Sequence, residues 1–251
     1  MIIAQVSDTH IDPDSPKGAE RVRDLERCVD DINRLDPLPD VVIHTGDLAH
    51  NGSPAKYAVA LRILGALRRP LLVAAGNRDD RTAIRSTFAA GRDLMPDTSF
   101  VQYSVDAYPV RLIALDTLSG TGNMGDFCDI RAHSLRSALA EDGTKPTALF
   151  MHHPPFEVRE SDYRWQFDSQ AGIDRMRRAL DGQNHVVRAF CGHAHRNAVG
   201  MIAQVPVSST PSVAIDLRLG TFPDEVRSVP LYQIHRFDAR HGFVSELRAA
   251  R

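Results

Sequence analysis

Five apolar runs, each followed at once by polar residues, constrain the fold of this chain more than any other feature. The runs are Ile2 to Val6, Val41 to Ile43, Leu71 to Ala75, Ala148 to Met151 and Val186 to Phe190. Continuous runs of this length are typical of strands that are buried on both faces of a sheet. Open α/β sheets bind ligands beyond the carboxyl ends of their strands. The sequence therefore predicts that five distant loops converge on one site.

The residues that follow the runs are of the types that bind metal ions. They are Asp8, His10, Asp47, Asn77, His152, His193 and His195. Imidazole suits zinc, iron and manganese, while carboxylate and amide oxygens suit manganese and also hold iron or zinc. A single aspartate after a strand is more often a turn or cap residue. Their ordered placement after buried strands indicates instead a hydrolytic site for two metal ions.

The remaining cysteines and histidines are given structural interpretations. No short paired spacing joins the cysteines, which are expected to be buried thiols: Cys28, Cys128 and Cys191. Four further histidines are expected to be polar surface or helix-end residues: His133, His185, His235 and His241.

Length and charge limit the classes of protein. The 251 residues contain no linker rich in Pro, Gly and Ser, so we expect a single domain over 1–251, with 211–251 as its strand-rich C-terminal extension. The formal net charge of -2 gives no global footprint for a nucleic-acid polymer. The first strand begins at Ile2 and no apolar stretch approaches ~20 residues, which predicts a cytoplasmic protein that makes no membrane contact.

Between the runs the apolar spacing changes to that of helices. Helices are expected at 18–35, at 54–64 with Ser53 as N-cap, from Asp80 or Arg81 to Ala90 with Gly91 as the stop, at 131–141 and at 169–181. A hairpin is expected from Phe100 to Leu115, and strands at Val199 to Ile202, Val205 to Ser208, Leu231 to His235 and Phe243 to Leu247. This order predicts an α/β (α+β) fold of two mixed β-sheets packed face to face, with helices outside.

The ordered motifs resemble those of the calcineurin-like metallophosphoesterases. The family pattern DxH, GDxx, GNxD, H and GHxH is matched in order and spacing, over about residues 2 to 210, by Asp8-Thr9-His10, Gly46-Asp47, Gly76-Asn77-Arg78-Asp79, His152 and Gly192-His193-Ala194-His195. The resemblance implies a four-layer αββα sandwich and a binuclear centre of Mn²⁺, Fe²⁺/Fe³⁺ or Zn²⁺. It also implies the ligands: Asp8, His10 and His195 for the first metal, Asn77, His152 and His193 for the second, and Asp47 as the bridge.

The resemblance further implies in-line attack on a phosphate ester by a metal-bridging hydroxide, with Asp47, Asn77 and Arg78 as catalytic residues. Much of the family has histidine at the position of Arg78. Arginine keeps a donor fork for phosphate but is a poor proton donor. Members that lack the histidine are biased toward diesters, so Arg78 indicates a phosphodiesterase. Alternatively, Arg78 pairs with Asp79 or Asp80; Asp79 is expected to help orient a metal-bound imidazole.

Further segments are similar to the bacterial class III cyclic-nucleotide and glycerophosphodiester phosphodiesterase branch. They are His152-His153-Pro154-Pro155-Phe156 and Gly52-Ser53-Pro54 with Tyr57. This resemblance favours a small-molecule phosphodiester substrate and a homo-oligomer. Three alternatives stay open: a phosphomonoesterase or a nuclease of the same superfamily, or a non-catalytic metal-binding scaffold.

Substrate identity is expected to depend on loops beyond the metals. The segment Glu157 to Gln170 contains Arg159, Tyr163, Arg164 and Trp165, and it forms either a lid over the substrate or an insertion packed on the body or on a subunit partner. His44, His50 and the glycine-rich loop Ser119 to Asp126 also lie near strand ends.

Overall fold

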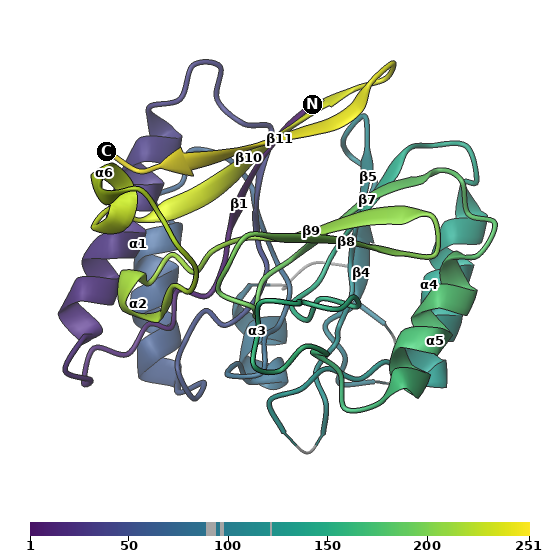
Figure 1. The fold of residues 1–251 in the computed structure, drawn as a ribbon, viewed down its shortest axis with the longest axis horizontal. Coiled ribbons are helices and arrows are strands. Elements are labelled where there is room, and N and C mark those ends of the chain that lie inside the picture. Colours follow the sequence, from purple (N-terminus) through teal and green to yellow (C-terminus); the bar gives the residue numbers. More distant parts are fainter. Residues whose placement is uncertain (89–93, 96–97, 121) are drawn as a thin grey trace.

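Two β-sheets lie at the centre of the molecule, and helices cover their outer sides (Figure 1). The computed structural model describes residues 1–88, 94–95, 98–120 and 122–251. Helices α1 (Gly18–Asn33) and α2 (Pro54–Leu64) lie beyond one sheet, and α4 (Asp129–Glu141) and α5 (Gln170–Leu180) lie beyond the other. The predicted four-layer αββα sandwich of two mixed sheets is thereby confirmed.

The first sheet joins the two ends of the chain. Its strands are β1 (Ile2–Val6), β2 (Val41–His44), β3 (Leu71–Val73), β10 (Leu231–Asp238) and β11 (Gly242–Ala249), in the order β11-β10-β1-β2-β3. Strands β1, β2 and β3 are parallel, whereas β10 runs antiparallel to β1 and β11 antiparallel to β10. The C-terminal hairpin therefore completes the sheet beside the first strand.

The second sheet has a parallel centre and antiparallel edges. Its strands are β4 (Tyr103–Val105), β5 (Arg111–Ala114), β6 (Thr147–Phe150), β7 (Val186–Cys191), β8 (Ala198–Ile202) and β9 (Val205–Ser209), in the order β4-β5-β6-β7-β9-β8. Strands β5, β6, β7 and β9 are parallel, and β4 and β8 pair antiparallel at the two edges. The hairpin predicted from Phe100 to Leu115 is confirmed as β4 and β5.

The strands of the second sheet alternate between two hydrophobic cores. In β6, Ala148 and Phe150 pack into the core between the sheets, while Leu149 and the following Met151 pack into the core under α4 and α5. Successive side chains of a strand point to opposite faces, so a strand covered on both faces needs apolar residues at every position. This explains why the runs in the sequence are continuous rather than alternating.

The predicted helices are present, with differences at their ends. Ser53 occupies the N-cap of α2 without a side-chain capping bond, whereas Asp80 caps α3 (Arg81–Thr87) by accepting from the N–H of Ala83. Helix α3 ends at Thr87, because Phe88 is its C-cap; the predicted end at Ala90 and stop at Gly91 lie outside the described residues. Two short helices, η1 (Ile215–Leu217) and α6 (Asp224–Arg227), precede β10.

Two structural interpretations of single residues are wrong. Cys28 and Cys191 are buried, but Cys128 is partly exposed because it lies at the N-cap of α4. His235 is fully buried rather than a surface residue, because the face of β10 that carries it turns toward the second sheet, where it stacks on Phe190 with ring centroids 4.1 Å apart. Among the helices described here, none is long and apolar enough to cross a membrane.

Candidate metal centre

All seven predicted ligand side chains meet where β1, β2, β3, β6 and β7 end. One group surrounds Asp8, which is fully buried. Asp8 Oδ1 lies 3.3 Å from His195 Nε2 and 3.9 Å from His10 Nε2, and the two ring nitrogens are 3.2 Å apart. Asp47 Oδ2 closes the group at 3.5 Å from His10 Nε2. These four side chains could hold one metal ion.

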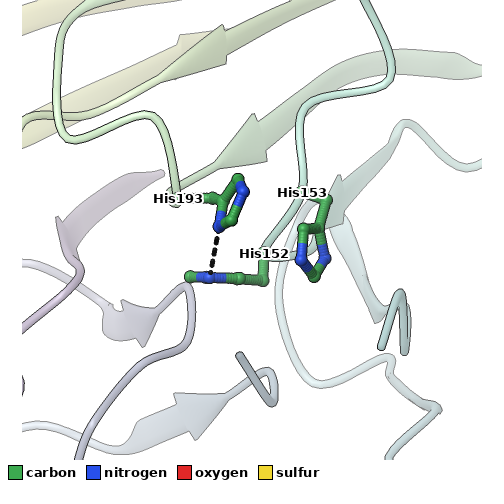
Figure 2. A group of neighbouring side chains, drawn as sticks. All are labelled: His152, His153 and His193. Carbon is green, nitrogen blue, oxygen red and sulfur yellow. Dashed lines mark hydrogen bonds between the residues drawn. The ribbon is translucent and has the colours of Figure 1, made fainter. Parts of the chain in front are cut away.

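A second group adjoins the first through the same aspartate. Asp47 Oδ1 lies 3.5 Å from His152 Nε2, which is 3.0 Å from Asn77 Oδ1 and 3.2 Å from His193 Nδ1. Figure 2 shows His193 and His152 joined through these ring nitrogens, with His153 beside them. Because each oxygen of Asp47 faces a different group, its carboxylate is placed between two candidate metal positions.

The rings present their lone pairs in the way that metal-binding histidines do. His152 Nδ1 lies 2.8 Å from the carbonyl oxygen of Thr45, and His195 Nδ1 lies 2.9 Å from that of Leu217. A carbonyl oxygen only accepts, so each Nδ1 carries a hydrogen, and each Nε2 turns a lone pair toward the centre whenever it is not itself protonated. A cation at the centre would take the place of that proton. The donor set therefore fits metal ions.

Burial keeps two of the imidazoles neutral, as metal ligands must be. It lowers the pKa of His10 to about 4 and that of His193 to about 3, although nearby carboxylates act in the opposite direction. Nδ1 of His10 is buried and has no hydrogen-bond partner among the described residues. Both rings can therefore donate lone pairs near neutral pH.

Two aspartate and histidine pairs supply the charge of the centre. Burial by itself would raise the pKa of Asp8 and of Asp47, but His195 and His152, respectively, hold both carboxyl groups below their usual range. Burial would likewise lower the pKa of His152, but Asp47 raises it to about 9. Without metal, His152 keeps a proton in the place that a cation would take, because ligand binding by imidazole displaces that proton.

The backbone at the centre is held in conformations that ordinary residues avoid. Five of the predicted ligands have positive φ angles between 43° and 63°: Asp8, His10, Asp47, His193 and His195. Such backbone persists only where surrounding contacts fix it, and it is concentrated at functional sites. Gly192 allows the close packing, because a Cβ there would collide with Ser7 Oγ and lie 2.7 Å from Asp8 Oδ2.

Asp79 does not orient a metal-bound imidazole as predicted. Its carboxylate accepts hydrogen bonds from the backbone N–H groups of Leu48, Ala49 and Gly76 and from the hydroxyl of Tyr57. The three backbone donors belong to the loops that follow β2 and β3, and Tyr57 belongs to α2. The prediction failed because the carboxylate lies beneath the loops, where burial and the charge of Asp47 raise its pKa to about 7.

Arg78 lies beside the bridging aspartate. Its backbone N–H donates to Asp47 Oδ1 at 2.8 Å. The alternative in which its side chain pairs with Asp79 or Asp80 is wrong, since Asp79 is occupied by the loop donors and Asp80 caps α3. Within the described part of the chain, the guanidinium of Arg78 has no ion-pair or hydrogen-bond partner.

His153 is a neighbour of the centre to which the sequence analysis assigned no role of its own. Its Nε2 lies 3.1 Å from the carbonyl oxygen of Asn123, so it carries the hydrogen, and its Nδ1 accepts from Thr117 Oγ1 at 2.9 Å. Both ring nitrogens thus already make hydrogen bonds. The ring nevertheless lies close enough to His152 and His193 for the three to form a possible metal-binding group. The adjacent pair in the sequence was the available signal.

The surrounding loops are tied to the centre by specific contacts. Asn123, in the glycine-rich loop, accepts from Asn77 Nδ2 at 3.5 Å; residue 121 of that loop lies outside the described residues. His44 is buried, and its Nε2 lies 3.1 Å from Oγ1 of Thr9, the residue between Asp8 and His10 in the chain. His50 packs beside His10 with ring centroids 5.9 Å apart.

The predicted lid segment keeps Tyr163 and Trp165 at the surface and buries Phe167. Tyr163 is 73% exposed and Trp165 is 43% exposed, so neither is packed inside the molecule. The segment begins at Glu157, which pairs with Arg164, and Arg196 donates to the carbonyl oxygen of Glu160. The lid and subunit-contact interpretations of this segment both stay predictions.

This combination of a four-layer sandwich and a shared aspartate between two ligand groups defines a metallophosphoesterase centre. The chain belongs to the calcineurin-like phosphoesterase family, whose model matches residues 1–197. The resemblance drawn from the motifs is thus confirmed.

Curated relatives within that family are phosphodiesterases by name. The chain is 29% identical over 252 residues to the probable glycerophosphodiester phosphodiesterase GpdQ of Arcobacter nitrofigilis, covering 98% of this chain and 92% of the relative. It is 31% identical over 221 residues to GpdQ of Enterobacter lignolyticus, covering 84% and 77%. It is 28% identical over 216 residues to a cAMP/cGMP dual specificity phosphodiesterase of Mycobacterium tuberculosis, covering 82% and 65%.

A solved structure shares the fold. A dimetal phosphatase from Danio rerio superposes with a TM-score of 0.75 at 13% identity, covering 100% of this chain and 96% of that one.

Proposed function

We propose that the protein is a binuclear metal-dependent phosphodiesterase that hydrolyses a small phosphodiester of the cyclic-nucleotide or glycerophosphodiester type. The convergence of two ligand groups on the single carboxylate of Asp47 carries the proposal. Membership of a phosphoesterase family and the names of the relatives support the reaction class and the size of the substrate.

Each side chain of the centre has a role in this proposal. Asp47 would bridge the ions, while the others would hold one ion each: Asp8, His10 and His195 the first, and Asn77, His152 and His193 the second. Cations bound there would supply a hydroxide nucleophile near neutral pH and positive charge against the phosphoryl oxygens. Manganese, iron and zinc all accept this mixture of imidazole and oxygen ligands.

Arg78 binds the phosphoryl group in this proposal. Its backbone is fixed against Asp47, and its guanidinium has no partner in the described chain, so the donor fork is available to phosphate oxygens. A guanidinium is a poor proton donor to a leaving alcohol, which favours substrates whose leaving group does not depend on an acid at that position.

The decisive experiment compares initial rates of hydrolysis of bis(p-nitrophenyl) phosphate and p-nitrophenyl phosphate by metal-free and manganese-reconstituted protein. We expect turnover only with metal and a preference for the diester. Preference for the monoester would assign a phosphatase instead. An Asp47→Asn variant serves as the control, because it keeps the shape of the side chain and should be inactive with both substrates.

A nuclease and a metal-binding scaffold would each give a different result when single-stranded DNA is added as a third substrate. A nuclease would prefer single-stranded DNA to the small diester, and the balanced net charge of -2 argues against a strand-binding surface. A metal-binding scaffold would bind manganese but turn over neither substrate. The homo-oligomer, the single domain over 1–251 and the cytoplasmic location stay predictions, which light scattering, limited proteolysis and cell fractionation would test.

A further inference from the structure

A chain of hydrogen bonds, buried except at its exposed end at Ser245, runs from the C-terminal hairpin to the metal centre. Ser245 of β11 lies 2.7 Å from His235 Nδ1, and His235 Nε2 lies 2.9 Å from Gln5 Oε1. Gln5 Nε2 then donates to Thr45 Oγ1 at 3.0 Å and to the carbonyl oxygen of Cys191 at 2.9 Å. Gln5, His235 and Thr45 are all fully buried. The chain therefore links β11, β10 and β1 to the ends of β2 and β7.

The chemistry of the groups fixes the direction of each bond. The carbonyl of Cys191 can only accept, so the amide nitrogen of Gln5 must face it and the amide oxygen must face His235. His235 therefore carries its hydrogen on Nε2, and its Nδ1 accepts from the hydroxyl of Ser245. Burial lowers the pKa of His235 to about 3, which keeps the ring in this neutral form. Gln5 thus uses both of its donors and its acceptor.

The two atoms that Gln5 holds are next to proposed ligands of the second metal. Thr45 precedes Gly46-Asp47, and its carbonyl oxygen accepts from His152 Nδ1 at 2.8 Å. Cys191 precedes Gly192-His193, and the N–H of Gly192 donates to the carbonyl oxygen of His152. One amide therefore fixes the relative positions of the loops that carry Asp47, His152 and His193.

The first ligand group has anchors that do not involve Gln5. Ser212 Oγ donates to the backbone oxygen of Asp8 at 2.8 Å. His195 Nδ1 donates to the carbonyl oxygen of Leu217 at 2.9 Å. Both anchors lie after β9 and before β10. Loss of the Gln5 contacts should therefore affect the two groups unequally.

We propose that Gln5 and His235 are positioning residues for the second metal ion. Through them the C-terminal hairpin sets the geometry of the catalytic centre, although this hairpin lies outside the residues that the family model matches. The proposal rests on the proposed binuclear function. Partners of metal ligands fix ring orientation and tautomer, and their loss commonly weakens metal binding 10- to 100-fold. Gln5 and His235 do not contact the ligand side chains themselves; they hold the strand ends that carry those ligands.

The test uses a double variant, Gln5→Met with His235→Phe. Methionine has nearly the length of glutamine, and phenylalanine keeps the stack on Phe190. Because both partners become apolar together, neither is left with a buried donor that lacks an acceptor. Zinc is titrated into the metal-free full chain, and binding is followed by the imidazole NMR signals of the four histidine ligands. We expect the zinc concentration needed to saturate His152 and His193 to rise about 10- to 100-fold, and that for His10 and His195 to change less than about threefold.

Tyr232→Phe is the matched control. Tyr232 lies on the same strand as His235, but its hydroxyl donates to Asp31 Oδ2 of α1 at 2.6 Å, away from the second sheet. This variant should lower the urea midpoint without changing zinc binding by either group. If it weakens the second group as much as the double variant does, general loosening of β10 explains the result and the proposal is wrong.

The remaining outcomes are distinct. Saturation of both groups at wild-type zinc concentrations in the double variant would overturn the proposal. If zinc leaves the histidine signals of the wild-type protein unchanged, the binuclear function itself fails and the inference falls with it. Should the double variant not fold, Gln5→Met alone is judged by the same criteria, because it removes the contacts to Thr45 and Cys191 and leaves the stacked ring in place.

Discussion

The stability of the metal-free protein should depend on pH through the pair formed by Asp47 and His152. His152 is fully buried, and its Nε2 lies 3.5 Å from Asp47 Oδ1. Burial alone would lower the pKa of His152, but Asp47 raises it from the ordinary value of 6.5 to about 9. The folded protein therefore binds this proton more tightly than the unfolded chain does.

The sign and size of the effect follow from this difference in pKa. The stabilisation is fully present below pH 6.5 and is lost as the pH rises to about 9. At about 1.4 kcal/mol for each pH unit, the loss in the free energy of unfolding is about 3 kcal/mol. Asp47→Asn should remove most of this loss, because a carboxamide carries no charge to hold the proton.

Urea denaturation in the presence of a chelator, repeated between about pH 6.5 and about pH 9, measures the effect. Asp238→Asn is the control, since it removes an exposed carboxylate far along β10 and should keep the wild-type slope. Saturating manganese should abolish the slope, because a cation displaces the proton. A wild-type protein whose stability is constant over this range, or an Asp47→Asn variant that keeps the full slope, would refute the reasoning.

Three further predictions follow from single residues of the centre. Arg78→His should raise monoester turnover relative to diester turnover, because histidine can protonate a leaving alcohol; an unchanged ratio in parallel assays with the two nitrophenyl esters would contradict this role. Gly192→Ala should lower the free energy of unfolding, measured by urea denaturation, by more than ~2 kcal/mol, because the new Cβ collides with Ser7. Gly143→Ala is the control and should be close to neutral, because nothing lies within 4 Å of its new Cβ. Asp79→Asn should cost about 1–3 kcal/mol in the same experiment, because a carboxamide oxygen cannot satisfy all the donors that the carboxylate accepts, and wild-type stability would show that these bonds are dispensable.

The positions of the ligand residues could be predicted because they depend on local patterns. An apolar run such as Val186 to Phe190 marks a buried strand, and the polar residues directly after it lie at the strand end in any arrangement of the sheet. Parallel pairing then brings these ends together, as it does for β6 and β7. The helices were found for the same reason, and the N-cap predicted at Ser53 is confirmed, although its side chain makes no capping bond.

The supporting contacts could not be predicted, because they depend on register between strands that are distant in the chain. His235 was taken for a surface residue, since its burial is set by pairing with Ile3 and by the second sheet beneath. The environment of Asp79 likewise depends on how two loops cross. A polar residue such as Gln5 inside an apolar run was the one available signal, because a buried amide requires partners.

The pairing of β1 with β10 should delay the acquisition of metals during synthesis. Gln5 leaves the ribosome 230 residues before its partner His235. Contacts of such separation form slowly, because a long loop must close before they are made. One edge of β1, the central strand of the first sheet, thus stays unpaired and exposed to other chains until β10 has emerged. Metal uptake should accordingly be one of the last events of folding, and chaperone binding to nascent chains should persist until β10 appears.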